Sequence, residues 1–322
     1  MELAEWIKQR ASSAGFQRCG IARAEPIGRG AFLRDWLAAG RAGSMAYLHR
    51  CLEERANPAL LLEGARSVIV FALSYRPCKA DEKEPTDGYG RIARYAWGED
   101  YHTVLKDKLF ALVGEIRAVV GENERFKVCV DTAPLLEREI AAAAGIGWIG
   151  KNTLILDAEW GSYLFLGAVI TTLDLPADDP VEDHCGTCTA CLDACPTGAL
   201  DAPYQMDAAK CISYLTIEHR DAVSESLVDR MGSWLFGCDI CQEVCPHNRH
   251  APATSEPRFA PRPPAPAIAS EEVLRWSVED YRSQLKGSAM RRAKLEMFQR
   301  NARILQQNAG VGGQEGHASR NT

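Results

Sequence analysis

The cysteines constrain this chain more than any other feature of its sequence. Eight of the twelve fall between positions 185 and 245. They form a C-x2-C-x2-C-x3-C-P run ending at Pro196, a single Cys211, and a C-x2-C-x3-C-P run ending at Pro246. Thiols at this density serve as metal ligands or as disulfides, and their spacing helps to distinguish the two uses.

The spacing is typical of a domain that binds two [4Fe–4S] clusters. In the bacterial ferredoxin pattern, three closely spaced thiolates hold three irons of one cluster, and the cysteine before the proline binds the other cluster. Applied here, the pattern uses all eight cysteines and predicts a protein that handles low-potential single electrons. It assigns the first cluster to Cys185, Cys188, Cys191 and Cys245, and the second to Cys195, Cys211, Cys238 and Cys241.

Two other uses of the cysteines fit less well. A zinc ribbon explains paired C-x2-C motifs, but neither the third cysteine of the first run nor the repeated Cys-Pro ending. Disulfides require export, and residues 1–15 read as an amphipathic helix, not as a signal peptide. We therefore expect a cytoplasmic protein whose other cysteines are reduced, buried thiols, namely Cys19, Cys51, Cys78 and Cys129.

Charge and hydropathy limit the kinds of partner that the protein is expected to bind. No segment approaches the roughly 18 apolar residues of a membrane helix, and the net charge of −6 argues against a general nucleic-acid coat. Between positions 282 and 303, however, seven basic residues face one acid, Glu296. Such a stretch is most often a solvated helix face, but the shortage of acids also fits phosphate contact. The candidates for contact with nucleic acid are Arg291, Arg292 and Lys294.

The first 175 residues predict a mixed α/β or α+β domain. Apolar periodicity predicts helices over 2–14, 30–39, 44–54 and 102–120, strands over 18–24, 67–75 and 126–132, and a hairpin over 152–175 that turns near Glu159–Gly161. The hairpin makes a simple doubly wound parallel sheet an unlikely architecture.

The remaining chain divides at two proline-rich segments. Residues 176–250 form the predicted ferredoxin-like domain, and 251–322 a proline-rich linker with a short basic helical tail. Helices are expected over 271–285 and 289–305, and the glycine-rich end, 308–322, is expected to fray.

The most concentrated candidate chemistry lies within 128–154. Asp131 ends a predicted strand, where α/β sheets present reactive groups, although it could also merely cap the next helix. That helix begins near Pro134, contains four alanines and stops at Gly145. The glycine spacing up to Lys151 fits neither a P-loop nor a dinucleotide fingerprint, which excludes a nucleotide site of either kind. From position alone, the role of Asp131 stays open.

His102 offers a weaker signal. Asp100-Tyr101-His102 partly matches the D-x-H-x-x-G motif that supplies an axial histidine to cobalamin, but Leu105 replaces the glycine. We therefore interpret His102 as an ordinary residue at a helix start. No other histidine forms a convincing metal-ligand pair in the sequence.

Four segments together resemble the epoxyqueuosine reductases, and the likeness covers nearly the whole chain to about residue 305. They are ARYAWGEDYH (93–102), VDTAPLLEREIAAAAGIGWIGKN (130–152), CGTCTACLDACPTGAL (185–200), and CISYLTIEH with GCDICQEVCPHN (211–248). The resemblance implies a cobalamin domain similar to that of reductive dehalogenases, without an axial histidine, followed by the two-cluster domain. It implies cobalamin and two [4Fe–4S] clusters as cofactors, and reduction of epoxyqueuosine to queuosine at the wobble position of tRNA.

The resemblance also implies roles for individual residues. Asp131 aligns with the family's proton donor, and His219 falls near a tRNA contact. The matching cobalamin positions are Arg55, Asp131, Gly150, Asn152, Leu154, Ser213 and Asp239.

Longer members of the family continue into HEAT-like repeats, which we do not expect here because the sequence stops soon after residue 305. The expected partners are therefore the anticodon stem-loop of tRNA, held by the cluster domain and the basic tail, and an electron donor such as a ferredoxin or flavodoxin. We expect a monomer and no membrane association. The alternatives are a dehalogenase-like cobalamin enzyme acting on a small molecule, which should lack a basic face, and a two-cluster electron carrier, which needs no large N-terminal domain.

Overall fold

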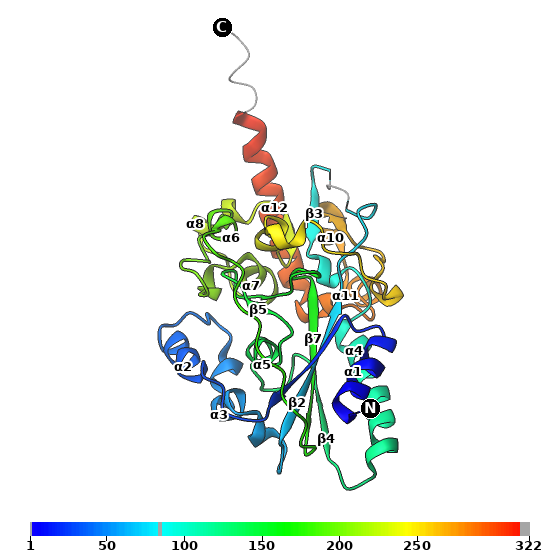
Figure 1. Ribbon diagram of the computed structural model, residues 1–322. Helices are drawn as coiled ribbons and strands as arrows, with labels where there is room; N and C mark the ends of the chain where they lie inside the picture. Colours follow the sequence, from blue (N-terminus) through cyan, green and yellow to red (C-terminus); the bar gives the residue numbers. More distant parts are fainter. Residues whose placement is uncertain (1, 83–85, 316–322) are drawn as a thin grey trace.

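The computed structural model describes residues 2–82 and 86–315, and Figure 1 shows how its elements are arranged. Its main sheet has four antiparallel strands in the order β1-β2-β7-β4. All eight residues of β2 are buried, because both faces of the sheet are covered. The strands are β1 (Arg18–Arg23), β2 (Ser67–Ser74), β7 (Leu164–Thr171) and β4 (Phe126–Cys129).

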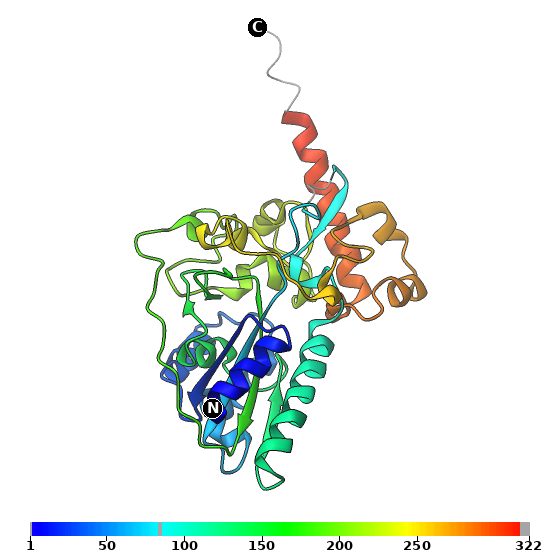
Figure 2. The same cartoon turned by 45° about the vertical axis from the view of Figure 1, so that its right-hand side comes forward.

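Alternate residues of β2 supply two cores, as expected for side chains that point to opposite faces of a strand. Ile69 and Phe71 pack on α1 (Leu3–Ser13) and α4 (Tyr101–Val120), which lie side by side over one face (Figure 2). Val68 and Val70 pack on the other face, against α5 (Glu137–Ala143). The shorter helices α2 (Gly30–Ala38) and α3 (Leu52–Ala56) lie near the same end of the sheet as α5 in Figure 1.

A second sheet joins distant parts of the sequence. Its order is β8-β3-β9, with β3 (Tyr89–Ile92), β8 (Trp234–Phe236) and β9 (Ala267–Ala269). Each of the three regions predicted from sequence therefore contributes one strand, so this sheet crosses the predicted boundaries. Helices α10 (Ser270–Arg275), α11 (Val278–Gln284) and α12 (Leu295–Glu315) follow, and α12 projects from the body of the molecule (Figures 1 and 2).

The cysteine-rich region has little regular structure. It contains the short helices α6 (Ala190–Asp193), α7 (Ile212–Ile217), α8 (Glu225–Val228) and α9 (Ile240–Glu243). Helices α6 and α9 carry a cysteine each and contact one another. A two-stranded ribbon, β5 (Trp148–Ile149) with β6 (Ile155–Leu156), lies beneath this region. No helix within the described residues is long and apolar enough to cross a membrane.

Several elements predicted from the sequence differ in the structure. The predicted helix 44–54 is a 3₁₀ turn (Ala46–His49) followed by α3, because Arg50 is extended and Cys51 is left-handed, with φ of 56°. The predicted strand 126–132 ends at Cys129. The predicted hairpin is reduced to one bridge between Asp157 and Gly161, since β6 pairs with β5 and β7 pairs with β2 and β4.

The C-terminal region also departs from prediction. The predicted helix 289–305 is interrupted at Ala293, whose extended backbone separates a 3₁₀ turn (Ala289–Arg292) from α12. Helix α12 continues to Glu315, through part of the segment expected to fray. The rest of that segment, 316–322, lies outside the described residues.

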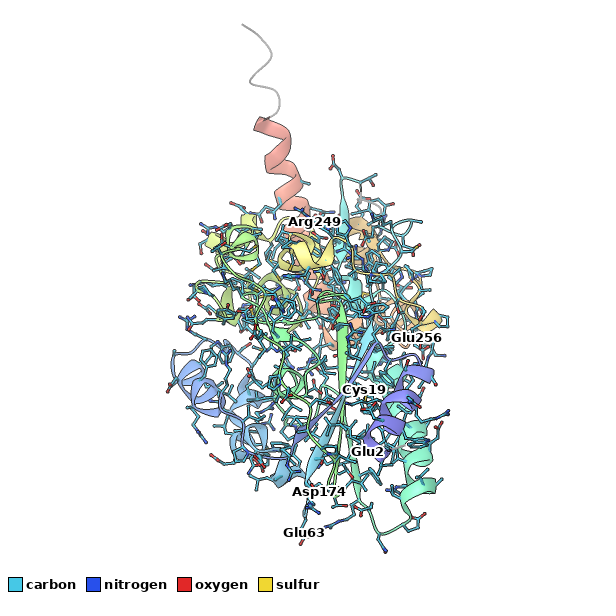
Figure 3. The ribbon with its side chains drawn as sticks, viewed as in Figure 1. Glu2, Cys19, Glu63, Asp174, Arg249 and Glu256 are labelled. Atoms are coloured by element: carbon cyan, nitrogen blue, oxygen red, sulfur yellow. The ribbon has the colours of Figure 1, made fainter. Side chains whose placement is uncertain are left out.

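The four cysteines outside the dense group were all expected to be buried, and two are not. Cys51 and Cys78 are exposed, whereas Cys129 is buried and Cys19 lies half-buried on β1 (Figure 3). Burial raises the pKa of Cys19 to about 12, so this thiol stays protonated at neutral pH.

Candidate functional site

The structure brings four cysteines of the dense group around one cavity. Cys185, Cys188, Cys191 and Cys245 line it together with Lys151, Asn152 and two histidines, His184 and His247. These are the four cysteines that the ferredoxin pattern assigns to the first cluster. Burial raises the pKa of the Cys191 thiol, and the neighbouring Cys245 adds to the rise. These thiols therefore stay protonated until a metal group displaces the proton and binds the sulfur as a thiolate.

The other four cysteines lie near one another and form a second group. Burial raises the pKa of Cys241 well above its ordinary value, and Cys211, Cys191 and Cys195 contribute through their charge. Burial also raises the pKa of Cys238, and the charges of Cys211 and Cys241 add to this rise. Because Cys241 interacts with members of both groups, the two groups are adjacent.

The geometry fits clusters better than single ions. Among residues 2–82 and 86–315, no three His, Cys, Asp or Glu side chains converge closely enough to hold one metal ion. In a [4Fe–4S] cluster each thiolate binds a different iron, so its four ligands surround a volume and do not meet at a point.

Asp131 lies just beyond β4, in a left-handed conformation with φ of 54°. This region costs an L-residue roughly 1 kcal/mol or more, so the surroundings must hold the turn. The backbone N–H of Asp131 donates to Glu137 Oε1 at 2.6 Å. At the end of the same loop, the N–H of Leu136 donates to the carbonyl of Arg55 on α3. These bonds fix a loop that presents the Asp131 side chain 56% exposed.

His102 lies at the start of α4, as predicted, and its ring also contacts the predicted site residue Asp131. Asp100 caps α4 by accepting from the His102 backbone N–H at 3.0 Å and also lies 2.8 Å from the ring Nδ1. The other ring nitrogen, Nε2, lies 3.1 Å from Asp131 Oδ2. The neighbouring Tyr101 stacks on Phe165 of β7 with ring centroids 4.4 Å apart, which anchors the start of α4 over the sheet.

The protonation states follow from these contacts. Burial lowers the pKa of His102, but its bonds with Asp100 and Asp131 outweigh burial and raise it to about 9. Burial raises the pKa of Asp131, yet the imidazolium of His102 leaves it below its ordinary value. Burial and the charge of Asp131 raise the pKa of Glu137 to about 8. At neutral pH the site therefore holds one proton on His102 and another on Glu137.

Of the predicted basic contacts, Arg292 reaches the edge of this site. Its guanidinium donates to both carboxylate oxygens of Glu218, at 2.8 and 3.1 Å, and lies 5.5 Å from the centre of the Tyr47 ring. Its positive charge also helps to lower the pKa of Asp131. Arg291 and Lys294 are exposed beside it.

Not every basic or polar candidate is free to contact a ligand. Arg300, within the basic stretch, donates to the carbonyls of Leu215, His219 and Asp221 and so braces the segment after α7. The His219 ring lies 3.0 Å from the carbonyl of Ala222, so this predicted tRNA contact is engaged within the chain.

The residues predicted to contact cobalamin differ in their burial and in their hydrogen-bond partners. Asn152 is 3% exposed, and its Nδ2 has no hydrogen-bond partner in the described part of the chain. Gly150 permits close packing, because a Cβ there would lie 2.2 Å from Leu156 Cδ1. The Asp239 carboxylate accepts a hydrogen bond from the backbone N–H of Arg94 at 2.7 Å. Burial raises the pKa of Asp239 to about 6. Leu154 follows Asn152 in the same loop, and Ser213 lies on α7.

Sequence reasoning missed the contacts that Glu137, Arg94 and His102 make in this region. The DYH triplet of residues 100–102 was the available signal, but its partner Asp131 lies 29 positions away along the chain. Arg94 bonds with Asp239 and Glu243 across still larger gaps of 145 and 149 positions. Such contacts depend on tertiary structure, which a single sequence does not display.

Comparison with known proteins gives a consistent result. Residues 55–132 match the family model "Epoxyqueuosine reductase QueG, DUF1730", and residues 184–248 match a 4Fe-4S double cluster binding domain. An epoxyqueuosine reductase of Cellulophaga algicola is 40% identical over 300 residues, covering 93% of this chain and 96% of that protein. That of Escherichia coli K12 is 41% identical over 312 residues, covering 96% of this chain and 82% of its own length.

Two solved structures extend the match to three dimensions. An epoxyqueuosine reductase crystallised with an epoxyqueuosine-modified tRNA-Tyr stem loop is 33% identical, with a TM-score of 0.89, and covers 95% of this chain and 81% of its own. The Bacillus subtilis enzyme, with an aspartate-bearing catalytic loop swung out of the active site, is 31% identical with a TM-score of 0.88 over 99% of this chain and 86% of that one.

Proposed function

This chain belongs to the epoxyqueuosine reductase family, and from that premise we propose that it reduces epoxyqueuosine to queuosine at the wobble position of tRNA. One observation carries the proposal. The Asp131–His102 pair and two four-cysteine groups occur together in a fold that matches, over 95% of this chain, a relative crystallised with the modified stem loop. A proton site and an electron path are the two things that epoxide reduction requires.

The overall reaction removes the epoxide oxygen as water and leaves a carbon–carbon double bond, so it consumes two electrons and two protons. The clusters, held by the eight cysteines, supply electrons one at a time at low potential. Cobalamin, when bound, supplies the strong reductant that acts on the epoxide carbon. Two features fit a corrin: the unpartnered amide nitrogen of buried Asn152, within the described residues, and the exposed face of Asp131.

The His102 ring does not serve as an axial ligand in this proposal. Its Nδ1 is bonded to Asp100 and its Nε2 to Asp131. Both ring nitrogens are therefore engaged within the chain, and neither is free to bind a metal. This agrees with the absence of the complete D-x-H-x-x-G motif at residues 100–105.

Asp131 is the proposed proton donor to the substrate, and His102 is the group that protonates Asp131. In the open site the imidazolium of His102 keeps the pKa of Asp131 low. A large flat ligand over the exposed carboxylate would remove water from it, and loss of water raises the pKa of a carboxyl group. The proton then moves from His102 Nε2 to Asp131 Oδ2, and from there to the departing oxygen. Asp100 holds the ring in the orientation that this transfer needs.

The tRNA contacts are proposed from charge and position. Arg291 and Lys294 are exposed next to Arg292, which lies at the edge of the Asp131 site. A wobble base delivered to Asp131 therefore brings its flanking phosphates close to these side chains. His219 is a weaker candidate, because its ring is already bonded to Ala222.

The remaining aspects of the proposal concern the cellular setting and organisation. We place the protein in the cytoplasm as a monomer that takes electrons from a donor such as a ferredoxin or flavodoxin. The division into a cobalamin domain (1–175), a cluster domain (176–250) and a tail (251–322) stays a prediction.

The decisive experiment is an anaerobic turnover assay on tRNA that carries epoxyqueuosine. Reconstituted protein and a strong reductant are used with cobalamin present or omitted, and the digested nucleosides are analysed by mass spectrometry. We expect a cobalamin-dependent loss of one oxygen mass. An unchanged nucleoside, with clusters and corrin verified in place, would contradict the proposed reaction.

A further inference from the structure

Trp148 occupies an unusual position behind the first group of cysteines. It lies on β5, is 3% exposed, and packs against Leu156, Cys185 and Cys245. Gly147 makes this position possible, because a Cβ at residue 147 would lie 1.9 Å from the carbonyl oxygen of Leu156. The two strands of the ribbon can therefore approach closely enough to press the indole against the cysteines.

Two histidines hold the indole in a fixed orientation. The ring of His184 meets it edge-on, with centroids 4.9 Å apart and planes at 78°. The ring of His247 does so at 5.0 Å and 75°. His184 directly precedes Cys185, and His247 follows Cys245 by two residues, so the segments that supply the thiolates also clamp the indole.

The indole N–H of Trp148 has no hydrogen-bond acceptor within the described residues. Among residues 2–82 and 86–315, Trp148 Nε1 is one of few buried side-chain nitrogens without a hydrogen-bond partner. A buried donor left unpaired costs about 1–3 kcal/mol, so a buried indole N–H usually finds an acceptor. Cys185 packs directly against Trp148, so the indole lies beside a proposed ligand of the first cluster.

We propose that the Trp148 indole N–H donates a hydrogen bond to a sulfur of the first [4Fe–4S] cluster and makes that cluster easier to reduce. A reduced cluster carries one more negative charge than an oxidised one, and the charge is spread over its sulfurs. An N–H aimed at these sulfurs stabilises the reduced state more than the oxidised state. Hydrogen bonds to the sulfurs are among the factors that set cluster potentials.

Lys151 lines the same cavity as Cys185 and adds a positive charge there. It is 9% exposed, and its Nζ donates to the carbonyls of Gly186 and Cys188 at 2.6 and 2.9 Å. Its positive charge is thus fixed to the loop that carries two of the thiolates. Around the second group, the Thr197 hydroxyl lies 3.6 Å from Cys195 Sγ. The proposed hydrogen bond therefore predicts a shift in the potential of the first cluster, and not which of the two clusters is the easier to reduce.

The test is a redox titration followed by electron paramagnetic resonance on the full, anaerobically reconstituted protein without cobalamin. Trp148→Phe keeps an aromatic ring between the two histidines and removes the N–H together with part of the indole, a loss of volume that the control below also carries. We expect one of the two reduction steps to move to a more negative potential, while the other stays at its wild-type value. The second cluster thus serves as an internal reference.

A matched control removes a different buried indole N–H. Trp276 is 5% exposed and lies at the end of α10, where its N–H faces Glu272. Trp276→Phe should leave both potentials unchanged. Unchanged potentials in Trp148→Phe as well, at full iron content, would overturn the proposal.

A second measurement on wild-type protein covers the case in which Trp148→Phe fails to hold iron. Protein labelled with ¹⁵N in its indole rings is reduced and studied by electron–nuclear double resonance. A ¹⁵N coupling to one cluster supports the hydrogen bond, and its absence contradicts it. The inference rests on the proposed ligands of the first cluster, but neither readout uses turnover, so its failure is distinguishable from failure of the reductase activity.

Discussion

His102 Nε2 lies 3.1 Å from Asp131 Oδ2, although the two residues are 29 positions apart in the sequence. The first comes from the start of α4 and the second from the turn after β4, so the main sheet brings them together. Asp100 fixes the opposite ring nitrogen at 2.8 Å. The result is a three-residue chain of hydrogen bonds that ends at the exposed oxygen of Asp131.

Replacing Asp131 tests the proton donor. Asp131→Asn keeps the size of the side chain but removes its acid, so turnover should fall roughly 10²- to 10⁴-fold. Iron content and cobalamin binding should stay at wild-type levels, which absorption spectra and metal analysis can check. Wild-type turnover in this variant would remove Asp131 from the proposed role.

The raised pKa of His102 predicts a pH dependence of stability. Its pKa in the folded chain is about 9, above the ordinary value of 6.5. The stabilisation is therefore fully present below about pH 6.5 and is lost as the pH rises through about 9. Because Asp131 is 56% exposed, solvent screening limits the effect to the order of 1 kcal/mol.

The measurement is thermal unfolding between pH 6 and 10, on protein with clusters and without cobalamin. His102→Gln should be less stable than wild type near pH 6, and the two should converge above pH 9. A difference that does not depend on pH would show that His102 contributes through packing and not through its charge.

Iron loss should follow the proposed division of the cysteines. Cys191→Ala should remove the first cluster and leave about four irons per chain, since each [4Fe–4S] cluster carries four. Cys241→Ala should remove the second cluster instead. Iron analysis with electron paramagnetic resonance distinguishes the two. Loss of the second cluster alone in Cys191→Ala would contradict the assignment.

The cysteine groups and Asp131 could be proposed from the sequence because their signals are local. A C-x2-C-x2-C run carries its meaning within a few residues, and Asp131 follows a readable strand. His102 and Trp148 could not, because each acquires its role from a partner that the fold supplies. Helical periodicity likewise gave no sign of the left-handed Cys51 or the extended Ala293, and both interrupt predicted helices.

The basic segment predicts a salt-dependent affinity for tRNA. Neutralising Arg291, Arg292 and Lys294 together to Gln should weaken binding and reduce the slope of log affinity against log salt by roughly 1.5 to 2, at about 0.7 for each phosphate contact. The slope should fall by less than three full contacts because Arg292 is already paired with Glu218. The measurement is a titration of the modified stem-loop at several salt concentrations.

The matched control changes the same number of charges at a distant place. Arg23 and Arg66 pair with Asp174, and Arg125 pairs with Glu63. Figure 3 shows Asp174 and Glu63 at the end of the sheet away from α12. Gln substitutions at these three arginines should leave the slope unchanged. An equal reduction of the slope in both triple variants would mean that the affinity for tRNA depends only on the net charge of the protein.

Arg300 lies in the same basic stretch but should behave differently. Its guanidinium donates to the carbonyl of Leu215 in α7 and to those of His219 and Asp221 after it, and burial lowers its pKa. Arg300→Met leaves those carbonyls without their donor, so the fold should lose about 2–4 kcal/mol. Arg303→Met, one helical turn later on an exposed face, should cost less than about 0.5 kcal/mol.

Thermal unfolding of the two variants separates a structural arginine from a nucleic-acid contact. The Arg300 variant should unfold at a lower temperature, yet at temperatures where it stays folded its salt slope for the stem-loop should match wild type. This outcome is expected because a guanidinium committed to three carbonyls has no free donor to exchange for a phosphate. A reduced slope with unchanged stability would reverse the assignment and place Arg300 on the tRNA-binding surface.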